Sequence, residues 1–74
     1  MTDTATLVRM VNQIAANMAH LPHDQAVAQI VTHLRSFWAP VMRADLVTYL
    51  DDGGLDLTPL AASAAEQVRA DVEH

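Results

Sequence analysis

The sequence predicts an all-α protein, a small bundle of about four short helices within a single domain that spans residues 1–74. Apolar residues recur at spacings of three and four positions in four segments, which is the period of an α-helix with one buried face. Prolines and a pair of glycines separate these segments, and no alternating pattern of useful length indicates a β-strand. We therefore expect helices near residues 4–20, 23–38, 40–51 and 59–71.

The first two segments have the strongest apolar stripes. Asp3 or Thr4 can cap the first helix, and Pro22 ends it. The short connection at Leu21-Pro22 favours an antiparallel pair of helices. Asp24 lies in the first turn of the second helix, where the helix dipole favours a negative charge. The stripes consist of Leu7, Met10, Val11, Ile14 and Met18 in the first segment and of Val27, Ile30, Val31, Leu34 and Trp38 in the second.

The third and fourth helices are marked by their ends. Pro40 can occupy the first position of the third helix, and Gly53-Gly54 supplies its C-terminal stop. Thr58-Pro59 is a cap residue followed by a proline, a typical helix start. The fourth stripe is mostly alanine and valine, so we expect this helix to be weakly held and to fray towards Val72-Glu73-His74. The two stripes are Met42, Leu46, Tyr49 and Leu50, and then Leu60, Ala64, Val68 and Val72.

Composition and charge limit the possible functions. A chain of 74 residues buries only roughly 60 % of its unfolded surface, and this one has no cysteine for a disulfide. We therefore expect a marginally stable domain that gains from a partner. The net charge of −5, with no lysine and four scattered arginines, argues against nucleic acid. The absence of a long apolar run or a signal segment predicts a cytoplasmic protein without a membrane span.

Metal and catalytic sites have little support in the residue pattern. His20 and His23 are separated by Pro22, which breaks the helix that would align them, and no cysteine completes a zinc site with His33. We therefore expect no metal ligand in this chain. No serine lies in a nucleophile motif, and no glycine-rich loop follows a strand. We expect that the chain is not an enzyme.

The acidic turn after the third segment has a structural explanation. Asp51, Asp52 and Asp56 surround two glycines, but their spacing does not match a calcium-binding loop. A solvated turn is the favoured interpretation, and a salt link to a basic partner is the alternative.

The corner between the second and third segments is the best candidate for a binding site. Phe37 and Trp38 are the only Phe and Trp of the chain and lie just before Pro40, with Met42 and Arg43 in the next turn. Aromatic, Met and Arg side chains are enriched in the centres of protein interfaces. Trp38 continues the inner stripe and Phe37 flanks it. Arg43 gains nothing from the dipole of its own helix, so we expect a carboxylate or backbone acceptor elsewhere. The predicted partner-binding residues are Phe37, Trp38, Met42 and Arg43.

Four segments resemble one known family. They are Leu7-Val8-Arg9-Met10-Val11-Asn12-Gln13-Ile14-Ala15, Pro22-His23-Asp24-Gln25-Ala26-Val27, Phe37-Trp38-Ala39-Pro40-Val41-Met42-Arg43 and Gly53-Gly54-Leu55-Asp56-Leu57-Thr58-Pro59-Leu60. In this order and spacing they resemble the small delta subunit of soluble, NAD-dependent, molybdenum-containing formate dehydrogenase. The resemblance covers roughly residues 7–65, and its most specific element is Phe-Trp-x-Pro-x-Met-Arg.

The resemblance implies an accessory, non-catalytic subunit of a cytoplasmic molybdoenzyme complex that oxidises formate and reduces NAD. In such complexes the large catalytic subunit holds molybdenum on pterin cofactors and iron–sulfur clusters, and other subunits carry FMN and the NAD site. The delta subunit is implied to support assembly, stability or molybdenum-cofactor insertion of the large subunit, its expected partner. This chain has neither cysteines for an iron–sulfur cluster nor a dinucleotide fingerprint, so we expect no cofactor in it.

An alternative from another class is a free-standing helical regulator or a homodimeric protein-binding module. Isolation separates the two, because a subunit co-purifies with a large molybdoenzyme and a regulator does not. The residues leave open which face docks, whether the association is permanent, and whether the partner holds molybdenum or tungsten.

Overall fold

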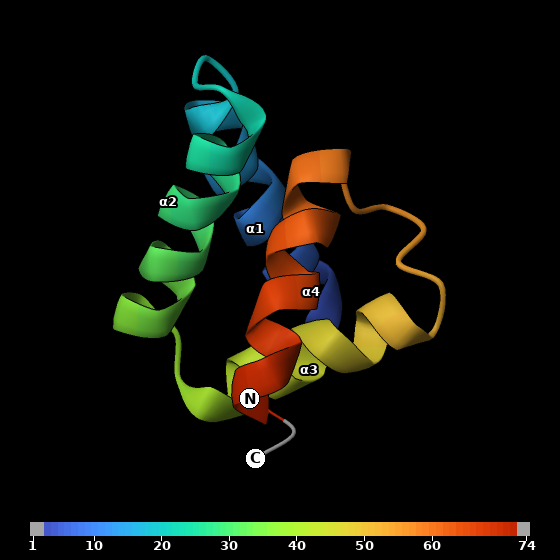
Figure 1. Ribbon diagram of the computed structural model, residues 1–74. Coiled ribbons are helices and arrows are strands. Elements are labelled where there is room, and N and C mark those ends of the chain that lie inside the picture. The colour runs from blue at the N-terminus through green and yellow to red at the C-terminus, as the bar shows by residue number, and fades with distance from the viewer. Residues whose placement is uncertain (1–2, 73–74) are drawn as a thin grey trace.

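The computed structural model describes residues 3–72, which form four α-helices and no strand. The helices are α1 (Thr4–Met18), α2 (His23–Phe37), α3 (Pro40–Asp51) and α4 (Pro59–Val72) (Figure 1). The all-α class predicted from the sequence is confirmed. The first helix ends two residues before its expected boundary, because the chain turns at residues 19–21 ahead of Pro22.

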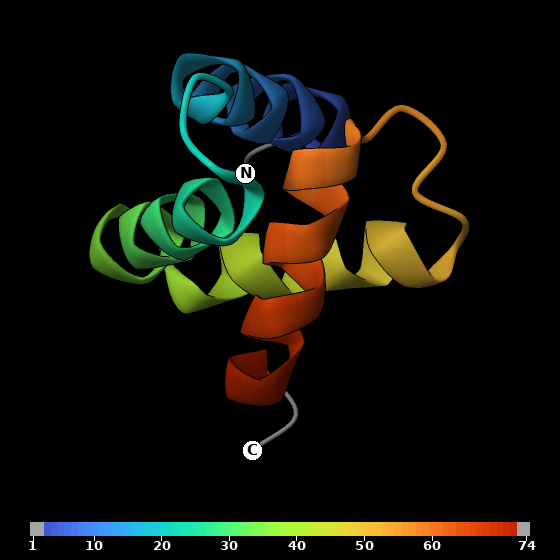
Figure 2. The ribbon, with the colours of Figure 1, turned by 45° about the horizontal axis from the view of Figure 1, so that its top comes forward.

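The helix α4 lies at the centre of the fold. The helices α1 and α2 run antiparallel to each other, and α3 crosses below them (Figure 1). The helix α4 packs against both α2 and α3 and also contacts α1 (Figure 2). Every other helix therefore contributes part of its apolar face to a core that it shares with the buried face of α4.

The core beside α4 is built from small side chains. Ala61, Ala64, Ala65 and Val68 are all completely buried. Small side chains let neighbouring helices approach closely, and this closeness brings many atoms of the surrounding helices into contact. The fourth helix is therefore covered by its neighbours more fully than its alanine-rich stripe suggests, and how firmly it is held stays a prediction. The helix is regular as far as Val72, and the expected fraying at Glu73 and His74 falls outside the described residues.

The predicted stripes agree with the buried faces to different degrees. All five residues of the second predicted stripe are buried, four in α2 and Trp38 at its C-cap. In α1, Val8 and Ala15 are buried in addition to Leu7 and Val11, whereas Met10 is 38 % exposed. Because α1 packs against three helices at once, its buried face is broader than one stripe and is turned away from Met10.

The C-terminus of α3 is closed by the glycine pair. The N–H of Gly53 donates to the carbonyl oxygen of Leu50 (3.1 Å), and that of Gly54 donates to the carbonyl oxygen of Tyr49 (3.0 Å). These are the two hydrogen bonds of a Schellman motif. Both glycines have positive φ, +122° and +57°, which side-chain-bearing residues adopt only with strain.

Capping at the helix N-termini follows the sequence signals in part. The Thr58 hydroxyl accepts a hydrogen bond from the N–H of Ala61 (3.3 Å), so this residue caps α4 as expected. Pro40 stands in the first turn of α3. Asp3 occupies the N-cap position of α1, but its side chain makes no capping hydrogen bond.

The loop between α3 and α4 is held by side chains from two helices. The Asn12 amide donates to the carbonyl oxygen of Asp56 (2.8 Å), and its oxygen accepts from the N–H of Thr58 (3.1 Å). The Tyr49 hydroxyl donates to the Asp56 carboxylate (3.2 Å) and accepts from the Asp56 N–H (3.3 Å). These contacts fix a loop from which Leu55 projects, 91 % exposed.

Candidate partner-binding surface

The corner between α2 and α3 separates its two aromatic side chains. Trp38 is the C-cap of α2, with an extended backbone, and its N–H donates to the carbonyl oxygen of Leu34 (3.0 Å). Its side chain is only 5 % exposed and belongs to the core, whereas Phe37 is 75 % exposed. Of the two candidate aromatic residues, only Phe37 presents most of its side chain to solvent.

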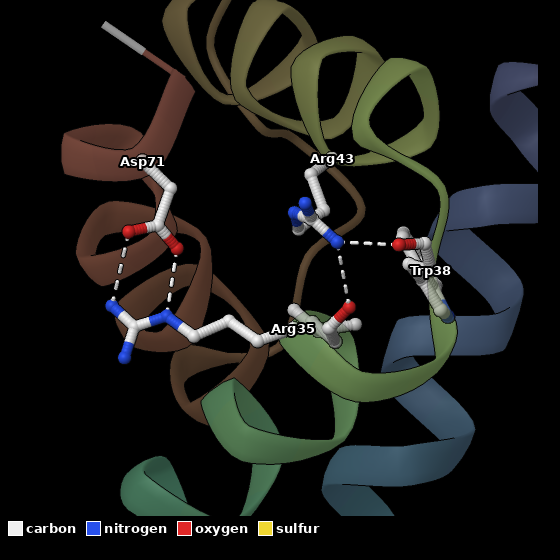
Figure 3. Close-up of polar contacts among 5 residues, drawn as sticks. Arg35, Trp38, Arg43 and Asp71 are labelled. Atoms are coloured by element: carbon white, nitrogen blue, oxygen red, sulfur yellow. Dashed lines mark hydrogen bonds and ion pairs between the residues drawn. The ribbon is translucent and has the colours of Figure 1, made fainter. Parts of the chain in front are cut away.

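Arg43 closes the same corner from the first turn of α3. Its guanidinium donates to the carbonyl oxygens of Leu34 (3.2 Å) and Trp38 (Figure 3). Both carbonyls lie at the C-terminal end of α2, where a positive charge is favourable. The Leu34 carbonyl also accepts the N–H of Trp38, so the Arg43 guanidinium is a second donor to it. Arg43 therefore stabilises the end of the preceding helix, and its acceptors are backbone groups.

A second arginine links α2 to α4 beside this corner. Arg35 pairs with Asp71 through two nitrogen–oxygen contacts, of 2.7 and 3.3 Å (Figure 3). Both side chains are exposed, so the pair contributes little to the free energy of folding, about 0–1 kcal/mol. Met42 is partly buried against the core. The corner is thus held by Trp38, Met42 and Arg43, which leaves Phe37 outward on a fixed backbone.

An open groove runs between α1 and α2 beside this corner. It has a volume of about 450 Å³, and its lining is mostly apolar. Phe37 lies at its edge, since its ring packs against the ring of His33 with centroids 4.8 Å apart. The lining residues are Thr6, Arg9, Met10, Gln13 and Ile14 from α1 and His33 and Trp38 from α2 and its C-cap.

Arg9, Met10 and His33 lie outside the partner-binding site predicted from the sequence. The spacing of His33 and Phe37, four residues apart on one helix, is a signal that could have identified this pair. The apolar spacing predicts that Met10 is buried, and it gives no sign that Arg9 and Met10 border a groove. Their position on the surface depends on how α1 packs against three other helices.

The histidine and aspartate side chains that could bind a metal do not lie close together in the fold. Within residues 3–72, no group of three or more His, Cys, Asp or Glu side chains could hold a metal ion. Asp51 pairs instead with Arg69 of α4 (2.6 Å), and a hydrogen bond from this guanidinium lowers the pKa of the Asp51 carboxyl. Arg69 also pairs with Glu66 (2.7 Å).

Among residues 3–72, none of the helices is long and apolar enough to cross a membrane.

The fold and this surface define a small all-α domain with an exposed aromatic ring beside an apolar groove, an arrangement typical of domains that bind other proteins. The family model described as NADH-dependent formate dehydrogenase delta subunit FdsD matches residues 6–65. The chain belongs to this family of accessory subunits, and the resemblance seen in the sequence is confirmed. Searches of curated proteins and of solved structures gave no match.

Proposed function

We propose that this chain is a non-catalytic delta subunit that docks on the large catalytic subunit of a cytoplasmic NAD-dependent formate dehydrogenase. There it supports assembly, stability or molybdenum-cofactor insertion of the large subunit, while other chains carry the pterin cofactor, iron–sulfur clusters, FMN and NAD. Family membership supports a place in the complex. The observation that carries the docking role is the Phe37 side chain, 75 % exposed on a corner whose neighbours are fixed.

The four predicted contact residues divide into two roles in this proposal. Phe37 contacts the large subunit directly. Trp38, Met42 and Arg43 hold the backbone of the corner, so that little conformational entropy is lost when Phe37 is buried by the partner. An aromatic side chain presented in this way is a candidate hot spot, whose truncation costs about 2 kcal/mol or more of binding free energy.

The docking step is tested with Phe37→Ala in a pull-down on complex purified without this chain. We expect unchanged helix content by circular dichroism, because the ring is mostly in solvent, and about a 30-fold loss of affinity. Leu55→Ala is the matched control, since it also truncates an exposed apolar side chain but on the loop between α3 and α4. Equal binding by Phe37→Ala and the wild type would show that Phe37 is not part of the interface.

The supporting role is tested by producing the enzyme with and without this chain. Molybdenum content of the large subunit measures cofactor insertion, the size of the complex measures assembly, and the rate of activity loss on storage measures stability. We expect at least one of these quantities to decline without the chain. Identical values in all three, or a chain that never co-purifies with the enzyme, would favour the free-standing regulator or homodimer.

A further inference from the structure

The groove between α1 and α2 differs in charge from the chain as a whole. The chain has a net charge of −5, yet none of the residues that line the groove is acidic. Its charged member is Arg9, which is exposed. A positive charge in an apolar groove attracts a negative group, and local complementarity of this kind selects partners and orients them.

Arg9 differs from the other arginines in its contacts. Arg35 and Arg69 form ion pairs with acidic side chains, and Arg43 donates to backbone carbonyls. Arg9 is the arginine whose guanidinium has no hydrogen bond or ion pair to any of residues 3–72. Its donors are therefore available, and a guanidinium recognises a carboxylate through two parallel hydrogen bonds.

The apolar part of the groove lies directly beside this guanidinium. Met10 is 38 % exposed, and Ile14 lies one helical turn further along α1. Met side chains are flexible and polarisable, so they adapt to an apolar side chain from a partner. His33 and the buried ring of Trp38 form the opposite wall. The groove thus offers a site for an apolar side chain and, next to it, a guanidinium that can bind a carboxylate.

We propose that this groove binds a segment of the large catalytic subunit in which an apolar side chain is followed closely by an aspartate or glutamate. The apolar side chain packs between Met10, Ile14 and Trp38, and the carboxylate pairs with Arg9. This inference rests on the proposed function, because it names the chemistry of the segment that the docked subunit recognises. It extends the contact from the Phe37 corner along α1.

A second copy of this chain is the less favourable occupant. Two chains that each carry a net charge of −5 repel each other. A two-fold contact through the groove would also place its Arg9 residues on one shared interface, without an acidic lining residue to pair with them. The charge argument therefore favours a different chain that supplies the carboxylate.

The proposal is tested with Arg9→Gln in binding to enzyme complex purified without this chain. Gln25→Glu is the matched control. It makes the net charge more negative by one unit, as Arg9→Gln does, but it lies among Ala28, Gln29 and Thr32 on the exposed face of α2. We expect Arg9→Gln to weaken binding about tenfold and to reduce its dependence on salt. We expect Gln25→Glu to bind within about threefold of the wild type, as an exposed site away from the contact does.

A photo-crosslinking amino acid in place of Met10 identifies the occupant. We expect a crosslink to a peptide of the large subunit that contains an apolar residue next to an Asp or Glu. A crosslink to a second copy of this chain, or to a basic segment, would overturn the inference. Equal binding by Arg9→Gln and Gln25→Glu would also overturn the groove proposal. If the wild-type chain still bound the complex in that case, the proposed docking function would be unaffected. Absence of binding by the wild-type chain would overturn both.

Discussion

Replacing Ala64 by Leu tests whether α4 is the tightly packed centre of this fold. Ala64 is completely buried in a helix that packs against both α2 and α3. Leucine is nearly as good a helix former as alanine, so the substitution leaves the intrinsic stability of the helix almost unchanged. The effect on the free energy of unfolding then reports the space around the side chain.

Loose packing and close packing around α4 predict changes of opposite sign in the free energy of unfolding of Ala64→Leu. If α4 were loosely covered, the larger side chain would bury additional apolar surface and would stabilise the protein at about 25 cal/mol/Å². In a close-packed core the added carbons force neighbouring side chains and backbone to shift, which costs about 1–3 kcal/mol. A domain of 74 residues has a free energy of unfolding of roughly 4–11 kcal/mol, so this loss is substantial. It corresponds to a fall in Tm of roughly 4–24 °C.

Thermal and urea denaturation followed by circular dichroism measure the effect. Ala70→Leu is the matched control, because it makes the same chemical change at an exposed position of the same helix. We expect Ala70→Leu to stay within about 0.5 kcal/mol of the wild type. In hydrogen exchange of the wild type, the amides of residues 61–68 should be among the slowest, since one face of this part of α4 is completely buried against other helices.

A Tm of Ala64→Leu equal to or above that of the wild type would refute this reasoning. It would mean that the space beside α4 can accept a larger side chain without displacement of α2 or α3. Rapid hydrogen exchange of the amides throughout α4 in the wild type would lead to the same conclusion. It would support the expectation, based on the alanine content, that the fourth helix is weakly held.

Two further predictions concern charged side chains. Arg43→Ala should lower the free energy of unfolding by about 1–3 kcal/mol with helix content retained, because the carbonyl oxygens of Leu34 and Trp38 each lose the guanidinium as a donor. Urea denaturation measures this loss. An unchanged midpoint would show that the contact of Arg43 with the end of α2 does not stabilise the fold. Asp51→Asn should change stability in a pH-dependent way, because Arg69 lowers the pKa of the folded Asp51 below its unfolded value. The contribution is therefore present above the unfolded pKa and is lost as pH falls through the folded one. The difference in urea midpoint between wild type and Asp51→Asn should be present at neutral pH and vanish at low pH, whereas a constant difference would contradict the assignment.

Local signals in the sequence were sufficient for the class of fold and for the ends of most elements. Thr58 acts through its capping hydroxyl, Pro59 through its missing N–H, and the glycines at 53 and 54 through a positive φ. Each effect reaches only a few residues along the chain. Adjacent residues on a helix point about 100° apart, so local geometry predicts that Phe37 and Trp38 do not both face the core. Family membership depended on the same short segments, which keep their order and spacing whatever the helices pack against.

Contacts between segments distant in the sequence decided the rest. Alanine has little surface to bury, so its pattern alone indicates a weak helix, and only the arrangement of three other helices around α4 turns it into the centre of the core. Arg43 acquires its acceptors because the bend at Pro40 returns the chain to the end of α2. Met10 and Arg9 face solvent because α1 packs on three helices at once. The rotation of one helix against its neighbours is set by the packing of all of them together, and no segment by itself contains that information.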